Sequence, residues 1–184
     1  MAELAGGRDA ALSSLIDRHG QKLFHYFVRL LHNETDAAEL AQETFVRIYQ
    51  SRQKFDPRLK FTTWLYTIAS NLVRDRFRWR SRHPQISLHS QNEQEAACLM
   101  HTVPASAPGP DDQIQTKERT AIIRRAIGAL PEELRQPLIL AVYQELPQSE
   151  IATVLGCSAK AVEMRIYRAR QQLRARLAHL LQEA

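Results

Sequence analysis

The sequence predicts an all-α protein in which two small helical domains are joined by a linker. Only six glycines occur among 184 residues, and the apolar residues recur at helical spacing. The hydrophobic share of 44% is enough for two modest cores. Between 83 and 111 the composition becomes polar and rich in proline, which is typical of a linker. We therefore expect helical domains at 8–82 and 112–184.

The first two helices are expected near the start of the chain. Apolar side chains fall near helical spacing from 9 to 31, with Gly20 as a point where this helix should break or bend. A second helix should begin in the sequence NETD, because Asn33 and Thr35 can cap its first turn. Pro57 marks the next break, since proline disfavours helical backbone in the residue before it.

The third helix carries an unusual arrangement of arginines. Thr62 or Thr63 can cap it, and its end reads NLVRDRFRWRSR. Each helical residue turns by about 100°, so the five arginines divide between two opposite faces. They are Arg74, Arg78 and Arg82 on one face and Arg76 and Arg80 on the other. Like charges four residues apart destabilise a helix by roughly 0.2–0.5 kcal/mol per pair, and only Asp75 offsets them. An anion is therefore their predicted partner.

The charge of the whole chain is arranged in blocks. Segment 74–82 holds five arginines against one aspartate, and segment 160–176 holds six basic residues against one glutamate. Segment 83–116 has four acidic residues and no lysine or arginine. The net charge is +5, and two concentrated basic segments indicate a polyanionic partner such as nucleic acid.

The second domain contains a helix-turn-helix pattern, QSEIATVLGCSAKAVEMRIYRARQQL. Ahead of it, Pro131 suits a first helical position and Pro137 should delay or kink that helix. Within the pattern, small Ala152 allows two helices to cross closely, and Gly156 can take the left-handed turn conformation. Ser158 can cap the second helix. The expected shared core is Ile151, Leu155, Val162 and Ile166.

A hairpin of this kind places its second helix in the major groove of DNA. The side chains expected to face the groove are Lys160, Glu163, Met164 and Tyr167, with Arg168 and Arg170 nearer the DNA backbone. Glu163 can accept a hydrogen bond from a cytosine amino group or repel phosphate, and Met164 can touch a thymine methyl group. The alternative is a helical hairpin whose basic face is merely solvated.

These stretches, in this order, resemble the extracytoplasmic-function (ECF) sigma factors of bacteria, group IV of the sigma-70 family. The likeness covers nearly the whole chain, from DAAELAQETFVRIY and FTTWLYTIASNLVRDRFRWR through the linker to LPEELRQPLIL and the helix-turn-helix. It implies sigma region 2 at 8–82, a linker at 83–111 and sigma region 4 at 112–184. The implied function is an alternative sigma factor that starts transcription of a stress- or envelope-responsive regulon, without enzymatic activity or cofactor.

The resemblance also implies which residues form each interface. In this family the helix matching Asp36–Tyr49 binds the β′ clamp helices of core RNA polymerase, and the β flap is a further polymerase contact. The implied polymerase-binding residues are Asp36, Glu39, Leu40, Glu43 and Phe45. The loop matching Phe55–Lys60 and the helix after it capture an unstacked base of the minus-ten element. The corresponding residues are Lys60, Trp64, Asn71, Arg74, Arg76, Phe77, Arg78, Trp79 and Arg80. The helix from Ser158 reads the minus-thirty-five element, and the acidic linker threads the polymerase interior.

Strand separation gives the arginines a physical role. It needs cations to hold phosphates and flat apolar groups on which exposed bases stack, each stack contributing roughly 1–3 kcal/mol. Phe77 and Trp79 meet that need, but they can equally be partly buried at a helix end that the arginines keep soluble. Trp64 heads an apolar stripe and suits the core better. The acidic residues at 36, 39 and 43 can also be an ordinary solvated face.

The main alternative is a stand-alone helix-turn-helix regulator, which leaves the acidic helix and the minus-ten-like stretch without a role. No nucleophile–base pairing or glycine-rich phosphate loop indicates an enzyme. His89, Cys98 and His101 would bind a metal only if the linker folded, so no metal site is expected. At the positions of Glu163 and Met164 many relatives carry a basic residue and a serine, which makes an unusual minus-thirty-five sequence the expectation.

The expected location is the bacterial cytoplasm. The N-terminal sequence lacks the pattern of a signal peptide, and no apolar run approaches the roughly 20 residues that span a bilayer. Two DNA-binding domains on a linker also lead us to expect an anti-sigma factor, because family members are commonly held inactive by one. A membrane-anchored anti-sigma factor would hold the protein at the inner membrane.

Overall fold

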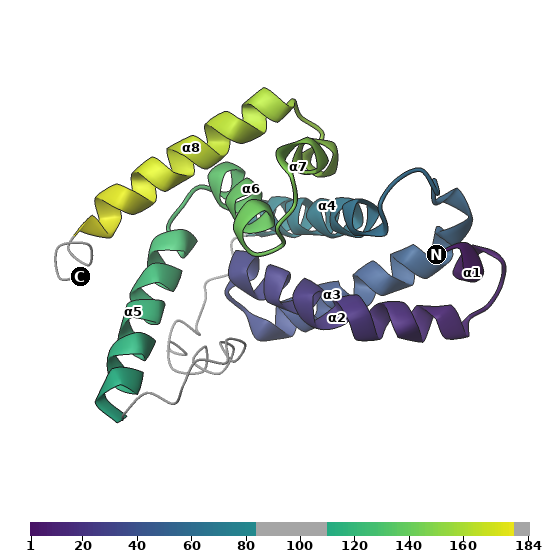
Figure 1. Ribbon diagram of the computed structural model, residues 1–184, viewed down its shortest axis with the longest axis horizontal. Coiled ribbons are helices and arrows are strands. Elements are labelled where there is room, and N and C mark those ends of the chain that lie inside the picture. The colour runs from purple at the N-terminus through teal and green to yellow at the C-terminus, as the bar shows by residue number, and fades with distance from the viewer. Residues whose placement is uncertain (84–109, 179–184) are drawn as a thin grey trace.

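The computed structural model describes residues 1–83 and 110–178, and all regular structure in these ranges is helical (Figure 1). The N-terminal bundle contains α1 (Ala2–Ala5), α2 (Ala10–Leu31), α3 (Glu34–Gln50), a 3-10 turn (Arg52–Lys54) and α4 (Phe61–Arg82). The C-terminal bundle contains α5 (Pro110–Gly128), α6 (Glu132–Val142), α7 (Gln148–Leu155) and α8 (Ala159–Arg176). The all-α prediction is confirmed, while residues 84–109 of the predicted linker lie outside the described residues.

Helix α2 runs through Gly20, so the expected break at that residue is wrong. A Cβ atom there would lie 3.6 Å from the Ile16 side chain and 3.9 Å from the Phe45 ring, so α2 and α3 pack closely at this point. These are ordinary van der Waals distances, so an alanine would also fit here, and the helix tolerates the roughly 1 kcal/mol cost of glycine because its apolar face packs in the core on either side. The expected cap of α3 is confirmed, because the Asn33 side chain accepts a hydrogen bond from the Asp36 amide at 2.9 Å.

The expected cap of α4 is wrong. The helix begins at Phe61, and the residue before it, Lys60, makes no side-chain capping bond. Thr63 is instead buried, and its hydroxyl donates to the carboxylate of Glu150 from the other bundle. The Thr63 side chain, which local rules assign to the cap of α4, therefore makes a tertiary hydrogen bond instead.

The helix-turn-helix forms as the sequence indicates. Gly156 adopts the left-handed conformation with φ +64°, and the Ser158 side chain accepts a hydrogen bond from the Ala161 amide at 3.1 Å. The buried side chains between the two helices include Ile151, Val162 and Ile166, whereas Leu155 is half-buried. Earlier in this bundle, α6 starts directly after Pro131 and contains Pro137, so its start is not delayed.

The two bundles pack against each other. Helices α6 and α7 lie on α2 and α4, and α8 lies on the side of α6 and α7 that faces away from the N-terminal bundle (Figure 1). Buried apolar residues of both bundles belong to one continuous core. Within the described ranges, no helix has both the length and the apolar character needed to cross a bilayer.

Candidate nucleic-acid and protein interfaces

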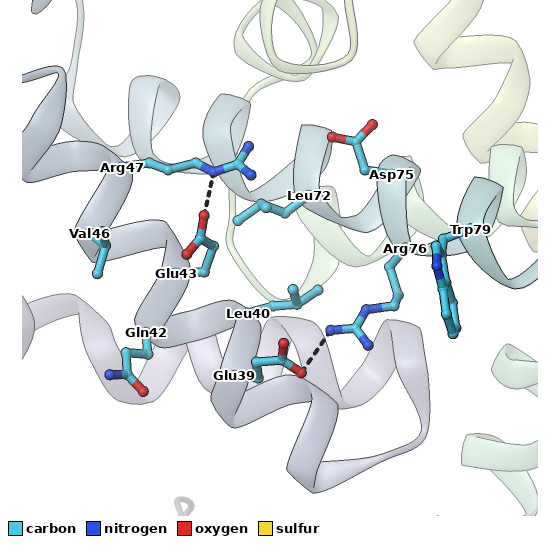
Figure 2. A pocket seen from close by; sticks show the side chains of 10 residues that line it. All are labelled: Glu39, Leu40, Gln42, Glu43, Val46, Arg47, Leu72, Asp75, Arg76 and Trp79. Carbon is cyan, nitrogen blue, oxygen red and sulfur yellow. Dashed lines mark hydrogen bonds and ion pairs between the residues drawn. The ribbon is translucent and has the colours of Figure 1, made fainter.

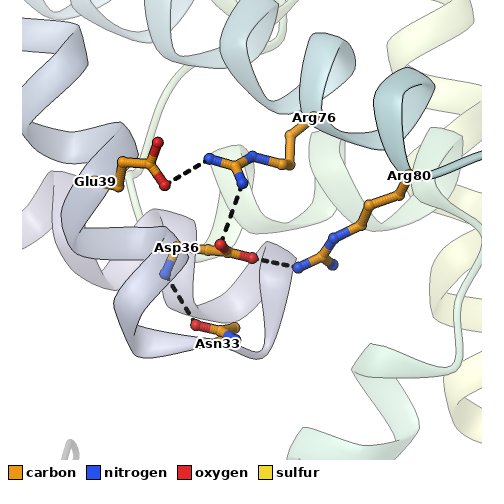
Figure 3. A network of polar contacts seen from close by, with 5 residues as sticks. All are labelled: Asn33, Asp36, Glu39, Arg76 and Arg80. Atoms are coloured by element: carbon orange, nitrogen blue, oxygen red, sulfur yellow. Dashed lines mark hydrogen bonds and ion pairs between the residues drawn. The ribbon is translucent and has the colours of Figure 1, made fainter. Parts of the chain in front are cut away.

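Two of the five arginines on α4 form ion pairs with carboxylates of α3 (Figure 3). Arg76 donates to Asp36 Oδ1 at 3.3 Å and to Glu39 Oε2 at 2.8 Å, and Arg80 donates to the other oxygen of Asp36. The side chains of Arg76 and Asp36 are only 21% and 18% exposed. The acidic start of α3 therefore supplies the partner that we expected from outside the chain, and the two helices are held together by this cluster.

The opposite face of α4 remains open to solvent. Arg78 pairs with Asp75 of its own helix at 2.8 Å, and both side chains are more than half exposed. Arg82 is exposed, whereas Arg74 is half-buried, donates to Asn71 at 3.2 Å and lies within electrostatic range of Glu132 of α6. Exposed pairs within one helix contribute little to stability, so Arg78 and Arg82 are available to an external anion.

A groove of about 620 Å³ lies between α3 and α4 (Figure 2). Two of its lining residues, Leu40 and Leu72, are each 5% exposed, whereas Val46 and Trp79 are 41% and 46% exposed. The polar lining residues are Glu39, Gln42, Glu43, Arg47, Asp75 and Arg76. An apolar strip with a charged rim is the usual composition of a surface that docks another protein.

This groove contains only some of the residues expected to bind a protein. Leu40, Glu39 and Glu43 line it, but Phe45 is 7% exposed and packs in the core, and Asp36 is engaged by Arg76 and Arg80. Val46 also lines the groove but was not among the predicted polymerase-binding residues. The sequence did hold a signal, because Val46 lies three residues after Glu43 and seven after Glu39, which places all three on one face of the helix.

The aromatic residues of α4 differ in their accessibility. Trp64 is half-buried against Phe55, with ring centroids 5.1 Å apart, as its place in the apolar stripe predicted. Trp79 is exposed and stacks on His83 at 4.9 Å with nearly parallel rings. Phe77 is half-buried. Trp79 is therefore the most exposed aromatic side chain on this helix.

Helix α8 presents all of its predicted DNA-facing residues on the surface. Tyr167 and Met164 are 55% and 38% exposed, and Ser158, Arg168 and Arg170 are also exposed. Lys160 donates to Glu163 at 2.9 Å, so the carboxylate that would repel phosphate is partly neutralised by its own helix. The structure thus brings these side chains together on one solvent-facing surface, as a groove-reading helix requires.

Comparison with known proteins identifies the family. Residues 15–83 match the family profile of Sigma-70 region 2, and residues 120–173 match that of Sigma-70 region 4. The chain is 32% identical to the ECF RNA polymerase sigma factor SigW of Bacillus subtilis over 175 residues, covering 95% of this chain and 92% of that protein. It belongs to the ECF sigma factors. We use region 2 for the N-terminal bundle and region 4 for the C-terminal bundle from here on.

Other relatives agree in sequence and fold. RNA polymerase sigma factor CnrH of Cupriavidus metallidurans is 35% identical over 176 residues, covering 96% of this chain and 91% of that protein. The structure of CnrH in complex with the cytosolic domain of CnrY has a TM-score of 0.66 at 28% identity, covering 97% of this chain and 94% of that one. The sigma factor RpoE of Bartonella quintana, in complex with the anti-sigma factor NepR, has a TM-score of 0.68 at 20% identity, covering 90% and 96% of the two chains, and shares the fold.

Membership of this family settles the general activity. ECF sigma factors are non-enzymatic subunits that bind core RNA polymerase and direct transcription initiation, with region 4 as a DNA-binding part. Homologous sigma factors have been crystallised with anti-sigma factors. In the described parts of this chain, no group of three or more His, Cys, Asp or Glu side chains could hold a metal ion, and His89, Cys98 and His101 lie outside them.

Proposed function

We propose that the groove between α3 and α4 is the surface with which this sigma factor binds the β′ clamp helices of core RNA polymerase. The carrying observation is that exposed apolar side chains, Val46 from α3 and Trp79 from α4, line one groove. Glu39 and Glu43 on its α3 wall are paired with Arg76 and Arg47 of the same groove, and basic side chains of the partner would compete for these carboxylates. Leu40 supports the groove from below, because it is nearly buried.

Two of the residues first assigned to polymerase binding take a supporting part in this proposal. Asp36 fixes α4 beside α3 through Arg76 and Arg80, and Phe45 fills the core beneath the groove-forming helix. The contact surface itself then consists of Glu39, Gln42, Glu43, Val46 and Trp79. The β flap is the second polymerase element that we assign to this protein, by its likeness to the family.

The promoter contacts are divided between the two ends of the chain. For the minus-ten element we assign the phosphate contacts to Lys60 and Arg78, with Asn71 beside them, while Trp79 is left to the polymerase groove. For the minus-thirty-five element we assign α8, through Ser158, Lys160, Glu163, Met164, Tyr167, Arg168 and Arg170. The corresponding domains are region 2 at 8–82, the linker at 83–111 and region 4 at 112–184.

We further infer that an anti-sigma factor controls this protein in the cytoplasm, either free or held at the inner membrane. The support is that two structurally similar sigma factors form such complexes. Capture of the tagged full chain from its own cells under several growth conditions tests the inference. Recovery of a second stoichiometric partner besides polymerase is expected, and recovery of polymerase alone under every condition would contradict it.

The experiment that tests the promoter proposal is transcription of the organism's fragmented genome by its core polymerase, with and without the full chain. New transcript starts that share two upstream elements are expected, and they would also give the promoter sequence. The same reaction with a Val46→Asp variant should lose these starts. Starts that persist with this variant would remove the groove from polymerase binding, whereas the absence of any new start would contradict promoter recognition.

A further inference from the structure

The first helix of the chain precedes the part that matches the region 2 profile, yet it is packed on that region. The matched part begins at residue 15, whereas α1 spans Ala2–Ala5. Leu4 is fully buried, and Met1 also packs against the core. Helix α1 contacts α2 and the 3-10 turn at Arg52–Lys54, at the end of the bundle where the chain passes from α3 to α4 (Figure 1). Burial of a whole leucine side chain therefore anchors this short segment.

A tight turn after α1 fixes its position relative to α2. Gly7 has φ +88°, a backbone conformation that favours glycine. Its amide donates to the Leu4 carbonyl at 3.2 Å, and the Arg8 amide donates to the Glu3 carbonyl at 2.9 Å. The docked position of Leu4 thus depends both on its own burial and on this turn.

The 3-10 turn that α1 contacts has little packing of its own. None of its three residues is buried. Arg52 links the turn to α3, because it donates to the Tyr49 carbonyl at 2.8 Å and its guanidinium lies 4.2 Å from the centre of the Tyr49 ring. Short 3-10 segments have poorer hydrogen-bond geometry than an α-helix, so such a turn depends on its neighbours for a fixed position. Helix α1 is one of these neighbours.

The 3-10 turn leads directly into the loop Phe55–Lys60, whose two ends meet at one tryptophan. The centroid of the Trp64 ring lies 5.1 Å from that of Phe55 and 6.4 Å from that of Phe61. The Phe61 ring also packs on His19 of α2 at 5.0 Å. With its ends held in this way, the loop has a conformation that a shift of the preceding turn would disturb.

The inside of the loop is a hydrogen-bonded turn that presents its tip to solvent. The Asp56 carboxylate accepts a hydrogen bond from the Arg58 amide at 2.9 Å, and the Asp56 carbonyl accepts one from the Leu59 amide at 3.0 Å. Leu59 is 44% exposed, and Lys60 is exposed. The loop therefore offers an apolar and a cationic side chain from an ordered backbone.

We propose that α1 is a positioning element for promoter opening, which acts through the 3-10 turn to hold the loop Phe55–Lys60 in the conformation that receives the unstacked minus-ten base. This inference rests on the proposed minus-ten surface. A loop that is already held in its binding conformation loses less conformational entropy when it binds, so it holds the base more tightly. Leu4 is buried and acts through the turn, without touching DNA.

The test releases α1 from region 2 in two independent ways in the full chain. Leu4→Asp removes the apolar anchor. Gly7→Val strains the turn, because a β-branched residue is disfavoured at φ +88°, although a Cβ atom there would meet no atom within 4 Å. Ala5→Asp is the matched control, since Ala5 is exposed on the same helix and the charge change equals that of Leu4→Asp. Urea unfolding and titration of labelled core polymerase verify that each variant is folded and binds the enzyme.

The probe is the labelled non-template strand of a promoter whose start has been mapped by the transcription experiment, offered to the holoenzyme. An abasic nucleotide is placed at each minus-ten position in turn. The ratio of the Kd values for the abasic and the intact strand reports contact with that one base. A loss of active protein or a weaker hold on the polymerase does not change this ratio, so the readout is independent of a general structural defect.

The unaltered chain and Ala5→Asp should lose about tenfold in affinity at one abasic position, and both release variants should lose only about twofold there. A loss that stays near tenfold in either release variant would overturn the role of α1 and leave base capture intact. A ratio that falls equally in Ala5→Asp would also overturn it, because charge and not docking would then be the cause. If no abasic position weakens binding of the unaltered chain, base capture by region 2 is wrong, and this inference is wrong with it.

Discussion

Helices α4 and α8 carry similar charges but use them differently. The end of α4 has five arginines against one aspartate, and α8 has six basic residues against one glutamate. Arg76 and Arg80 of α4 are paired with acidic residues of α3, and Lys60, just before α4, is paired with Glu150 of α7. Among the described residues, the ion pair on α8 joins Lys160 to Glu163 of the same helix.

The comparison teaches that a basic segment is not by itself a nucleic-acid surface. Arg76 and Arg80 hold α4 against α3, Lys60 just before α4 is paired with region 4, and Arg78 and Arg82 are exposed. In α8, Arg176 donates to the Ala126 carbonyl of α5 and Arg165 to Cys157 Sγ, whereas Arg168 and Arg170 are exposed. Four experiments test this difference, in order of the expected size of their effects.

The largest effect is expected on stability at Phe45, which was assigned to polymerase binding but lies in the core beneath that surface. Replacing Phe45, which is 7% exposed, by alanine should lower the free energy of unfolding by roughly 3–5 kcal/mol, because it empties the core between α2 and α3. Replacing its neighbour Val46, which is 41% exposed, by alanine should change it by less than about 0.5 kcal/mol. Urea unfolding measures both values, and equal losses would show that Phe45 is not a core residue in solution.

The next effect concerns the groove. Val46→Asp should weaken binding to core polymerase by about 2 kcal/mol, roughly thirtyfold, because it places a charge on the apolar strip beside Glu43. Ile16→Asp is the matched control, since Ile16 is also 41% exposed but is not among the groove-lining residues. Titration of labelled core enzyme measures both affinities. Similar losses in the two variants would point to general misfolding or nonspecific repulsion and would remove the groove assignment.

A smaller effect separates the paired arginines of α4 from the free ones of α8. Arg76→Ala should destabilise the fold by about 1–2 kcal/mol, because the largely buried Asp36 loses one of its two partners. Arg168→Ala should leave stability within about 0.5 kcal/mol, yet lower the salt dependence of duplex binding by about one phosphate contact. Urea unfolding and anisotropy at several salt concentrations supply the two readouts. The reverse pattern would mean that Arg76 binds DNA and Arg168 does not.

The smallest effect is a pH dependence of the packing between the two regions. Burial, followed by the charges of Arg135 and Arg124, lowers the pKa of His32 from its ordinary value of 6.5. The packed arrangement therefore favours neutral His32, while separation of the regions lets this side chain take up a proton near the ordinary value. The contribution of His32 to the packing should be fully present above about pH 6.5 and should weaken as the pH falls below it.

Glu150 acts in the same direction at lower pH. Its hydrogen bond from Lys60 is the main reason that its pKa is lowered, so its contribution is present above the ordinary value and is lost as the pH falls through the lowered one. Scattering at pH 7.5 and 5.5 measures the change. His32→Gln should remove most of it, whereas His19→Gln should not, because His19 packs on Phe61 within region 2. An unchanged response in the His32 variant would exclude this histidine as the source.

The sequence alone determined the features that depend on neighbouring residues. The cap at Asn33, the left-handed Gly156, the cap at Ser158 and three of the four predicted core positions of the helix-turn-helix are present, and they follow from rules that act over a few residues. The same local rules predicted a break or bend at Gly20, yet the helix runs through this residue because the flanking turns of α2 pack in the core.

Only the tertiary structure decided which basic side chains remain available to bind an external anion. Helical periodicity told us that Arg76 and Arg78 point in opposite directions, but not which direction meets another helix. The partner of Arg76 is 40 residues away along the chain and that of Lys60 is 90 residues away. Ion pairs at such separations form because apolar packing brings α3, α4 and α7 together, and the burial of those apolar faces is a property of the whole chain rather than of any segment.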